Sequence, residues 1–252
     1  MSVKNMNDPT TTHFGFRDVL DSEKASLVKG VFDSVAANYD VMNDLMSLGV
    51  HRLWKNTLIE TLRPHPNMKL LDVGGGTGDI AFRFLDKGGR KATICDINHD
   101  MVSHGQDRAI NLGHLSGLTW IVGDAEQLPI EDSSVDAFTI AFCIRNVTHV
   151  DRALLEARRV LKPGGRFLCL EFSRVALPLL EKAYDTYSFK VLPWLGGAFA
   201  NDREAYQYLA ESIRQFPDQQ RFEQMISDAG LSRVSYRNLS GGIAALHSAW
   251  RI

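Results

Sequence analysis

The stretch Leu70-Leu71-Asp72-Val73-Gly74-Gly75-Gly76-Thr77-Gly78-Asp79 decides the fold of this chain. An apolar run followed by closely spaced glycines is typical of a buried strand that turns tightly into a helix. The spacing of Asp72, Gly74, Gly76 and Gly78 differs by one residue from the Gly-x-Gly-x-x-Gly of most dinucleotide-binding turns. That difference points away from a nicotinamide cofactor and towards S-adenosylmethionine.

Strands and helices alternate on the carboxyl side of this turn, as in a parallel sheet covered by helices on both faces. The expected strands are 69–73, 92–97, 118–122, 135–143 and 166–172, and the expected helices are 79–86, 99–112 and 148–161. We expect Thr148 to cap the last helix, with Asp151 three residues later. Ligands of such sheets bind beyond the carboxyl ends of the strands, so the site is expected there.

The flanking segments indicate one domain with additions. We expect a flexible arm over 1–20 and a single domain over 21–252. Within it, the sequence predicts N-terminal helices over 22–64, a cofactor-binding core over 69–172, a helical lid over 176–229 and two C-terminal strands over 232–252.

Two further segments match an adenosine cofactor. Asp96 ends the second predicted strand, where a carboxylate can accept hydrogen bonds from both ribose hydroxyls. The alternative for Asp96 is a helix cap for the segment that begins at His99. Asp124 follows the third strand, where it can accept from the adenine amino group while the Ala125 amide donates to a ring nitrogen. The alternative for Asp124 is an ordinary turn residue.

Transfer of a sulfonium methyl group is an in-line displacement, so the site must align a nucleophile and exclude water. Arg145 and Asn146 follow the fourth strand on the same rim and can orient or polarise an oxygen-bearing acceptor. Their structural alternatives are an ion pair with a surface acid for Arg145 and a turn or cap for Asn146. The rim lacks the Asp/Asn-Pro-Pro-aromatic signature of enzymes that methylate amino groups of nucleobases.

The composition excludes several classes of function. The chain has 252 residues and a formal net charge of -2, without the basic footprint of a nucleic-acid binder. Its three cysteines lie in apolar runs and its eight histidines form no ligand pattern, so we expect reduced thiols and no metal. The polar N-terminus resembles neither a secretory signal nor a transit peptide, and no apolar run reaches membrane-spanning length. We therefore expect a cytoplasmic protein.

Two long segments carry a family resemblance. Tyr39 to Lys55 (YDVMNDLMSLGVHRLWK) and Arg159 to Ser173 (RVLKPGGRFLCLEFS) resemble the two signatures of the ubiquinone/menaquinone biosynthesis C-methyltransferase family, and Ile144 to Thr148 also resembles it. The resemblance covers about 13–252. Two positions depart from the pattern, because Ala141 stands where some members have Ser, and Cys143 where many have Gly.

The resemblance implies the α/β fold of class I S-adenosylmethionine-dependent methyltransferases, with a mixed seven-stranded sheet whose last strand is antiparallel. It implies C-methylation of a polyprenylated benzoquinol, or of demethylmenaquinol in some members. Thr77, Asp96 and Asp124-Ala125 match its cofactor contacts, which join Asp72, Gly74, Gly76 and Gly78 of the turn.

A quinol ring carbon becomes nucleophilic as the neighbouring hydroxyl loses its proton. We expect Arg145 to stabilise the developing phenolate, directly or through water, and Asn146 to hold the oxygen. Tyr39, His51 and Tyr184 are candidates for contact with the greasy substrate, with core packing as the alternative. The hydrophobic tail suggests peripheral contact with the inner membrane, and an assembly of quinone-biosynthesis proteins or a homodimer.

Other functions stay open from the sequence. The first is another small-molecule O- or C-methyltransferase with a different acceptor. An NAD-dependent oxidoreductase needs the other glycine spacing, and a non-catalytic protein that only kept the fold has no need of Asp96 and Asp124.

Overall fold

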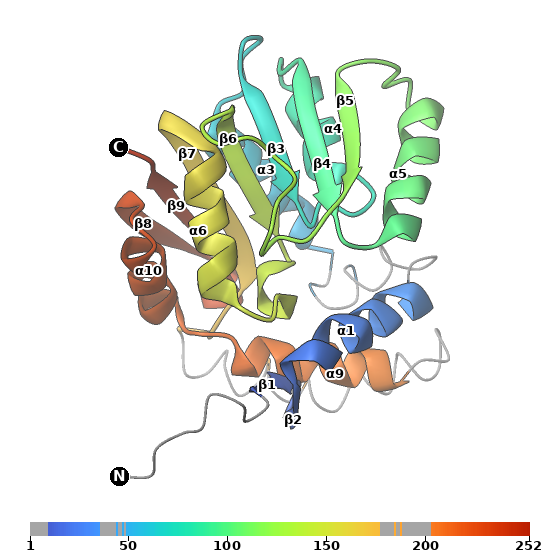
Figure 1. Cartoon of the computed structure of the whole chain (residues 1–252), viewed down its shortest axis with the longest axis vertical. Helices are drawn as coiled ribbons and strands as arrows, with labels where there is room; N and C mark the ends of the chain where they lie inside the picture. Colours follow the sequence, from blue (N-terminus) through green and yellow to red (C-terminus); the bar gives the residue numbers. More distant parts are fainter. Residues whose placement is uncertain are drawn as a thin grey trace.

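The computed structural model describes residues 10–35, 44, 47, 49–176, 184, 187 and 203–252. In this part of the chain, a twisted seven-stranded sheet carries the strand order β5-β4-β3-β6-β7-β9-β8 (Figure 1). The strands from β5 to β7 are parallel, and β9 pairs antiparallel with both β7 and β8. The predicted mixed sheet of seven strands is confirmed.

The core strands lie close to their predicted positions: β3 (Lys69–Val73), β4 (Lys91–Asp96), β5 (Leu118–Val122), β6 (Val135–Ala141), β7 (Leu161–Phe172), β8 (Ser232–Leu239) and β9 (Ala244–Trp250). β7 begins five residues before the predicted strand, so Lys162 to Gly165 belong to it rather than to a turn. A register shift between Val135 and Ala137 lets β6 pair with both parts of β7.

Helices cover both faces of the sheet. On one face, α3 (His51–Leu62) and α4 (Asp79–Asp86) pack on side chains such as Leu70 and Ile94. On the other face, α6 (Val150–Val160) and α10 (Gln219–Asp228) pack on Leu71 and Phe138. Successive residues such as Leu70 and Leu71 face opposite ways, and both are fully buried, as expected of a strand covered on both faces.

The last helix of the predicted lid is part of the sheet's cover. Phe222 and Ile226 of α10 are fully buried in the same cluster as Leu154 and Ala157 of α6. The predicted lid over 176–229 is therefore too long at its carboxyl end. The periodicity of α10 predicts a helix correctly, but it does not say which surface its apolar face meets.

The predicted flexible arm is wrong for 11–20, which form the antiparallel hairpin β1 (Thr11–Phe14) and β2 (Arg17–Leu20). Phe14 is buried and stacks on Tyr208 of α9 (Arg203–Gln215), with ring centroids 4.1 Å apart. The Phe16 N–H donates to the Glu211 carboxylate of the same helix at 3.0 Å. The hairpin depends on these long-range contacts, which a local sequence pattern does not reveal.

α1 (Asp21–Val35) and α9 lie side by side below the carboxyl ends of the strands, with the hairpin against them (Figure 1). α5 (His99–Asn111) flanks β4 and β5 at the other end of the sheet. This arrangement leaves a hollow between the strand ends and α1.

Candidate cofactor and acceptor site

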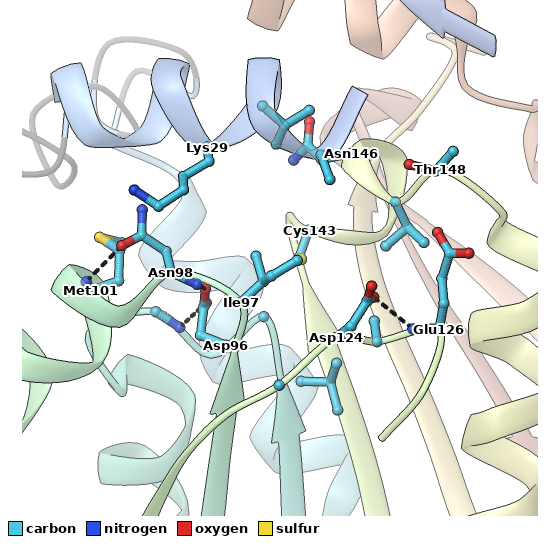
Figure 2. A pocket seen from close by; sticks show the side chains of 18 of the residues that line it. Lys29, Asp96, Ile97, Asn98, Met101, Asp124, Glu126, Cys143, Asn146 and Thr148 are labelled. Carbon is cyan, nitrogen blue, oxygen red and sulfur yellow. Dashed lines mark hydrogen bonds between the residues drawn. The ribbon is translucent and has the colours of Figure 1, made fainter. Parts of the chain in front are cut away.

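A cavity of about 840 Å³, which includes space open to solvent, lies between the carboxyl ends of β3, β4 and β6 and one face of α1 (Figure 2). Its wall comes from five stretches of chain: α1 around Val28, the glycine turn, the exit of β4, Gly123 to Glu126, and Phe142 to Thr148. This is the rim on which the sequence placed the site, and adjacent parallel strands bring the stretches together.

The glycine turn gives the cavity its floor. Gly74, Gly76 and Gly78 have φ values of 60°, 52° and 87°, which favour glycine. A Cβ on Gly74 would lie 2.1 Å from the Cys143 Sγ. The glycine turn and the segment after β6 can therefore approach this closely only because residue 74 has no side chain. The Gly74 N–H also donates to the Cys95 carbonyl at 2.7 Å, which anchors the turn to the end of β4.

Asp96 lies at the base of the cavity. One oxygen accepts from the Gly76 N–H at 2.8 Å and the other from the Asn98 N–H at 2.9 Å. Burial raises the pKa of Asp96, while these backbone donors oppose the shift. The cap of α5 is Asn98, whose side chain accepts from Asp100 and Met101, so the cap interpretation of Asp96 is wrong. The Asp96 carboxylate instead faces the cavity.

Asp124 and Ala125 line the neighbouring wall, and Figure 2 shows the Asp124 side chain across the cavity from Lys29. The Asp124 carboxylate accepts from the Glu126 N–H at 2.9 Å, which closes a short turn after β5. Asp124 is therefore a turn residue, as the alternative interpretation has it, and it also lines the cavity.

The remaining residues of the predicted cofactor set lie elsewhere. Asp72 and Thr77 border a smaller hollow of about 380 Å³ on the other side of Gly74. Gly78 packs against Trp120 and Phe82. The Thr77 hydroxyl accepts from Arg108 at 3.0 Å, so this side chain already has a partner within the protein.

Asp72 is a buried acid, and only one of its two carboxylate oxygens accepts a hydrogen bond among the described residues. Its Oδ1 accepts from the Thr139 hydroxyl at 2.7 Å, and its Oδ2 has no hydrogen-bond partner among the described residues. Burial raises the pKa of Asp72 to about 7, although the Thr139 hydrogen bond and the charge of Lys55 favour the ionised form.

The smaller hollow holds an ion pair that the sequence analysis did not single out. Lys55 of α3 and Asp79 of α4 lie 2.8 Å apart, and Arg83 contacts the second oxygen of Asp79 at 3.1 Å. Burial opposes ionisation of Asp79, but the charge and hydrogen bond of Lys55 together with the charges of Arg83 and Arg108 outweigh burial and lower the pKa of Asp79 to about 2. The available signal was Lys55 itself, a charged residue on the buried face of an amphipathic helix.

Arg145 does not reach the cavity as the sequence predicts. Its guanidinium forms a buried ion pair with Glu171 of β7 at 2.7 Å, and both side chains are 2% exposed. It also donates to the Phe142 carbonyl at 2.7 Å and to the Ser212 hydroxyl of α9 at 3.3 Å. The structural alternative for Arg145 was an ion pair, and the structure shows one, with a buried rather than a surface acid. The sequence does not predict Glu171 and Ser212 as partners of Arg145, because only the fold brings them to this rim.

Asn146 does line the cavity, on the side nearest α1 (Figure 2). It is 7% exposed, and its Oδ1 accepts from the Tyr208 hydroxyl of α9 at 3.0 Å. Its Nδ2 has no hydrogen-bond partner among the described residues.

The predicted cap at Thr148 is wrong. α6 begins after His149, which makes no side-chain cap, and the His149 N–H donates to the Glu126 carboxylate at 2.9 Å. Thr148 borders the cavity instead. The carboxylate of another loop satisfies the helix end, and the local sequence could not show that.

Hydrogen bonds tie α1 to both rims of the cavity. Lys24 donates to the Val147 carbonyl at 3.1 Å on one side, and Asn98 donates to Asp33 at 2.7 Å on the other. Burial lowers the pKa of Lys24, while nearby Glu126 and Asp21 oppose the shift. α1 thus forms a roof over the cavity.

Of the three predicted substrate residues, the two that the structure describes, His51 and Tyr184, do not line the cavity. Tyr39 lies outside the described residues, and Tyr184 is half-buried. His51 is buried and its Nε2 lies 2.8 Å from the Asp44 carboxylate. Burial and the charge of Lys55 lower the pKa of His51.

The model of the ubiE/COQ5 methyltransferase family matches residues 17–251, nearly the whole chain. The chain belongs to this family. The resemblance inferred from its two signature segments is confirmed, and so is the enzyme class, a methyltransferase.

Relatives of this methyltransferase match it along almost its full length. A protein of Paracoccus denitrificans named "Ubiquinone/menaquinone biosynthesis C-methyltransferase UbiE" is 56% identical and covers 98% of this chain and 99% of its own. A Bos taurus protein named "2-methoxy-6-polyprenyl-1,4-benzoquinol methylase, mitochondrial" is 51% identical and covers 97% of this chain and 85% of its own.

Solved structures confirm the predicted class of fold. A SAM-dependent methyltransferase of Thermotoga maritima has a TM-score of 0.63 at 19% identity, covering 88% of this chain and 99% of its own. A SAM-dependent methyltransferase of Aquifex aeolicus has a TM-score of 0.56 at 18% identity, covering 79% and 89%. The predicted cofactor of this methyltransferase, S-adenosylmethionine, agrees with its family and its fold. No helix in the described part of the chain has the length and apolar character needed to cross a membrane.

Proposed function

We propose that this methyltransferase transfers a methyl group from S-adenosylmethionine to a ring carbon of a polyprenylated benzoquinol. The observation that carries the proposal is the 56–57% identity over 98% of the chain to proteins named for ubiquinone/menaquinone biosynthesis. The same name supports demethylmenaquinol as a second acceptor.

The cavity fits the adenosine part of the cofactor. The Asp96 carboxylate offers oxygen atoms to the ribose hydroxyls, and Asp124 with the Ala125 N–H borders the space for the adenine. Gly74 and Gly76 line the same wall. In the smaller hollow beyond Gly74, the Asp72 oxygen that has no hydrogen-bond partner among the described residues would suit the ammonium group of the methionine part.

When bound, S-adenosylmethionine supplies a sulfonium methyl group for in-line displacement. The acceptor carbon forms a bond to this methyl group as the sulfur–carbon bond breaks, and the carbon then loses its hydrogen as a proton. The protein's part is to align the ring, exclude water and stabilise charge on the neighbouring oxygen. Asn146 is placed to donate to that oxygen, because its amide nitrogen is buried at the cavity wall.

Arg145 takes a different part in this proposal from the one expected of it. Its hydrogen bond to the Phe142 carbonyl supports a residue with a φ of 57°, directly before Cys143 on the rim. The buried ion pair with Glu171 fixes the guanidinium in that place. Arg145 therefore shapes the acceptor side of the cavity, while the Glu171 carboxylate balances its charge.

The polyprenyl tail of the acceptor leads us to include peripheral contact with a membrane in the proposal. We also include a partner protein in a quinone-biosynthesis assembly, or a second copy of the chain in a homodimer, because either would add membrane-contacting surface to a protein that takes its substrate from a bilayer. Flotation of the protein with anionic lipid vesicles, with and without the demethylated benzoquinol, tests this part.

The decisive test is an assay with purified protein and isotopically labelled S-adenosylmethionine. The acceptors are a demethylated polyprenyl benzoquinol and demethylmenaquinol, and mass spectrometry identifies the products. We expect a labelled methyl group on a ring carbon of the benzoquinol. Label on an oxygen would favour an O-methyltransferase, and no transfer to either quinol by protein that binds cofactor would contradict the proposal.

A pair of variants tests the cofactor placement in the same assay. Asp96→Asn removes a charged acceptor at the base of the cavity and should weaken S-adenosylhomocysteine binding about 10- to 100-fold. Asp100→Asn changes an exposed carboxylate in the first turn of α5 and should leave binding close to that of the wild type. Calorimetric titration measures both, and equal affinities would remove Asp96 from the cofactor site.

A further inference from the structure

The amide of Asn146 is an unusual feature of the cavity wall. The residue is more than nine-tenths buried, yet its Nδ2 has no hydrogen-bond partner among the described residues. A buried amide donor without a partner costs stability, so such groups are rare in folded proteins. The donor lies on a residue that borders the cavity, where an acceptor atom of a ligand can satisfy it.

Tyr208 decides which end of this amide is available. The Tyr208 hydroxyl donates to the Asn146 Oδ1 at 3.0 Å. Since an amide carries its acceptor oxygen and its donor nitrogen on opposite sides, fixing the oxygen on Tyr208 leaves the nitrogen for the other side. Without the hydroxyl, the amide can rotate and present its carbonyl oxygen, which repels an anionic oxygen atom.

The position of Tyr208 is itself fixed by distant parts of the chain. Its ring stacks on Phe14 of the N-terminal hairpin, with an interplanar angle of 18°. One turn further along α9, the Ser212 hydroxyl accepts from the Nε of Arg145. α9 therefore contacts both neighbouring residues of the rim: Ser212 accepts from Arg145, and Tyr208 donates to Asn146.

We propose that Tyr208 is a positioning residue for methyl transfer, because its hydrogen bond holds the amide nitrogen of Asn146 towards the acceptor oxygen. The inference rests on the proposed function and adds a requirement on the substrate. The oxygen next to the methylated carbon must accept a hydrogen bond, as a phenolate or hydroxyl oxygen does. Tyr208 acts through Asn146 and does not border the cavity itself.

A double-mutant cycle tests the inference. The variants are Tyr208→Phe, Asn146→Ala and the two combined, assayed for kcat and for KM of the benzoquinol. We expect Tyr208→Phe to lower kcat about tenfold, in keeping with the loss of one hydrogen bond. Asn146→Ala should lower it at least as much. Adding Tyr208→Phe to Asn146→Ala should change nothing further, because the residue through which Tyr208 acts is gone.

Two controls separate positioning from packing. Tyr206→Phe changes another buried tyrosine of α9 that is placed in the hydrophobic core, and it should leave kcat within twofold of the wild type. Urea unfolding and S-adenosylhomocysteine affinity should be alike for Tyr208→Phe and the wild type, since the ring and its stacking on Phe14 remain.

The outcomes are distinguishable. If the wild type transfers no methyl group to a quinol, the proposed function fails. If the wild type is active but the losses from Tyr208→Phe and Asn146→Ala multiply in the double variant, the role of Tyr208 is overturned. If Tyr208→Phe does not fold, Asn146→Asp provides a second test of the inference. It replaces the donor nitrogen with an acceptor, so wild-type activity in this variant would overturn the inference as well.

Discussion

Gly74 and Cys143 meet where the glycine turn contacts the rim after β6. The backbone of Gly74 has a φ of 60°, and the Cys143 side chain occupies the space into which a Cβ on Gly74 would project. The Cys143 thiol is accommodated here because it packs over the bare Cα of Gly74.

Gly74→Ala should lower the free energy of unfolding by about 2–4 kcal/mol, from positive φ and from the clash with Cys143. In a Cys143→Gly background the clash is relieved, because the next atom, the Cys143 Cα, lies 4.0 Å away. The same substitution should then cost only about 1–2 kcal/mol. Urea unfolding of the four proteins measures the coupling.

Gly113→Ala is the matched control for Gly74→Ala. Gly113 has a φ of 81°, and a Cβ there would meet no atom within 4 Å. Its cost should therefore stay near 1–2 kcal/mol with or without Cys143. Equal costs for Gly74→Ala in both backgrounds would show that the thiol does not limit this position.

The sequence predicts the place of a site residue well where that residue directly follows a strand. Asp96 and Asp124 follow strands, so their arrival at one rim follows from a parallel sheet. Arg145 follows a strand too, but its guanidinium turns to Glu171, which lies 26 residues later in β7. Nothing local distinguishes a buried ion-pair partner from a ligand, so the predicted contact with the acceptor could not be corrected without the fold.

At the scale of elements, periodicity predicts the helices and strands but not their partners. β3, α4 and β5 begin and end at the predicted residues. The local sequence does not predict the hairpin of β1 and β2, because its stability comes from the stacking of Phe14 on Tyr208 and from Glu211 at its turn. The sequence places α10 in the lid for a related reason, since the pattern of an amphipathic helix does not show which surface the helix covers.

α1 offers the test at this scale, because it forms a roof held at both rims. Asp33→Ala removes the hydrogen bond from Asn98 and frees that end of the helix from β4. Release of S-adenosylhomocysteine should become about 2–10 times faster, since one hydrogen bond of the roof is lost, while the association rate changes little. Stopped-flow displacement measures the rate.

Asp107→Ala removes an exposed carboxylate of α5 and serves as the control for charge. It should leave the release rate unchanged. If Asp33→Ala also leaves it unchanged, the hydrogen bond to Asn98 does not hold the roof during ligand release, and α1 must open elsewhere.

At the scale of the whole molecule, two of the buried titratable groups, His247 and Asp72, respond to pH in opposite ways. His247 of β9 lies between Phe222 and Tyr236, and its Nε2 is 3.0 Å from the Gln219 carbonyl. Burial lowers the pKa of His247 to about 4. Burial raises that of Asp72 to about 7. Burial therefore disfavours the charged form of both groups.

The sign of each contribution follows from which state binds more protons. Between pH 4 and 6.5 the unfolded chain protonates His247 and the folded protein does not, so stability rises with pH. Between pH 4 and 7 the folded protein keeps the Asp72 proton that the unfolded chain releases, so stability falls with pH. The shifts correspond to about 3 kcal/mol for His247 and about 4 kcal/mol for Asp72.

Urea unfolding of the cofactor-free protein at pH 4.5 to 8 should resolve the two contributions by difference. Asp72→Asn should gain stability relative to the wild type as the pH rises to 7, because its neutral side chain no longer resists burial. His247→Gln should lose its advantage over the same rise, because the wild-type imidazole becomes neutral in both states. Packing changes shift each curve by a constant, and titrating groups that do not interact with the replaced side chain cancel in the difference. Parallel curves for a variant and the wild type would therefore show that the replaced group does not titrate between the two states.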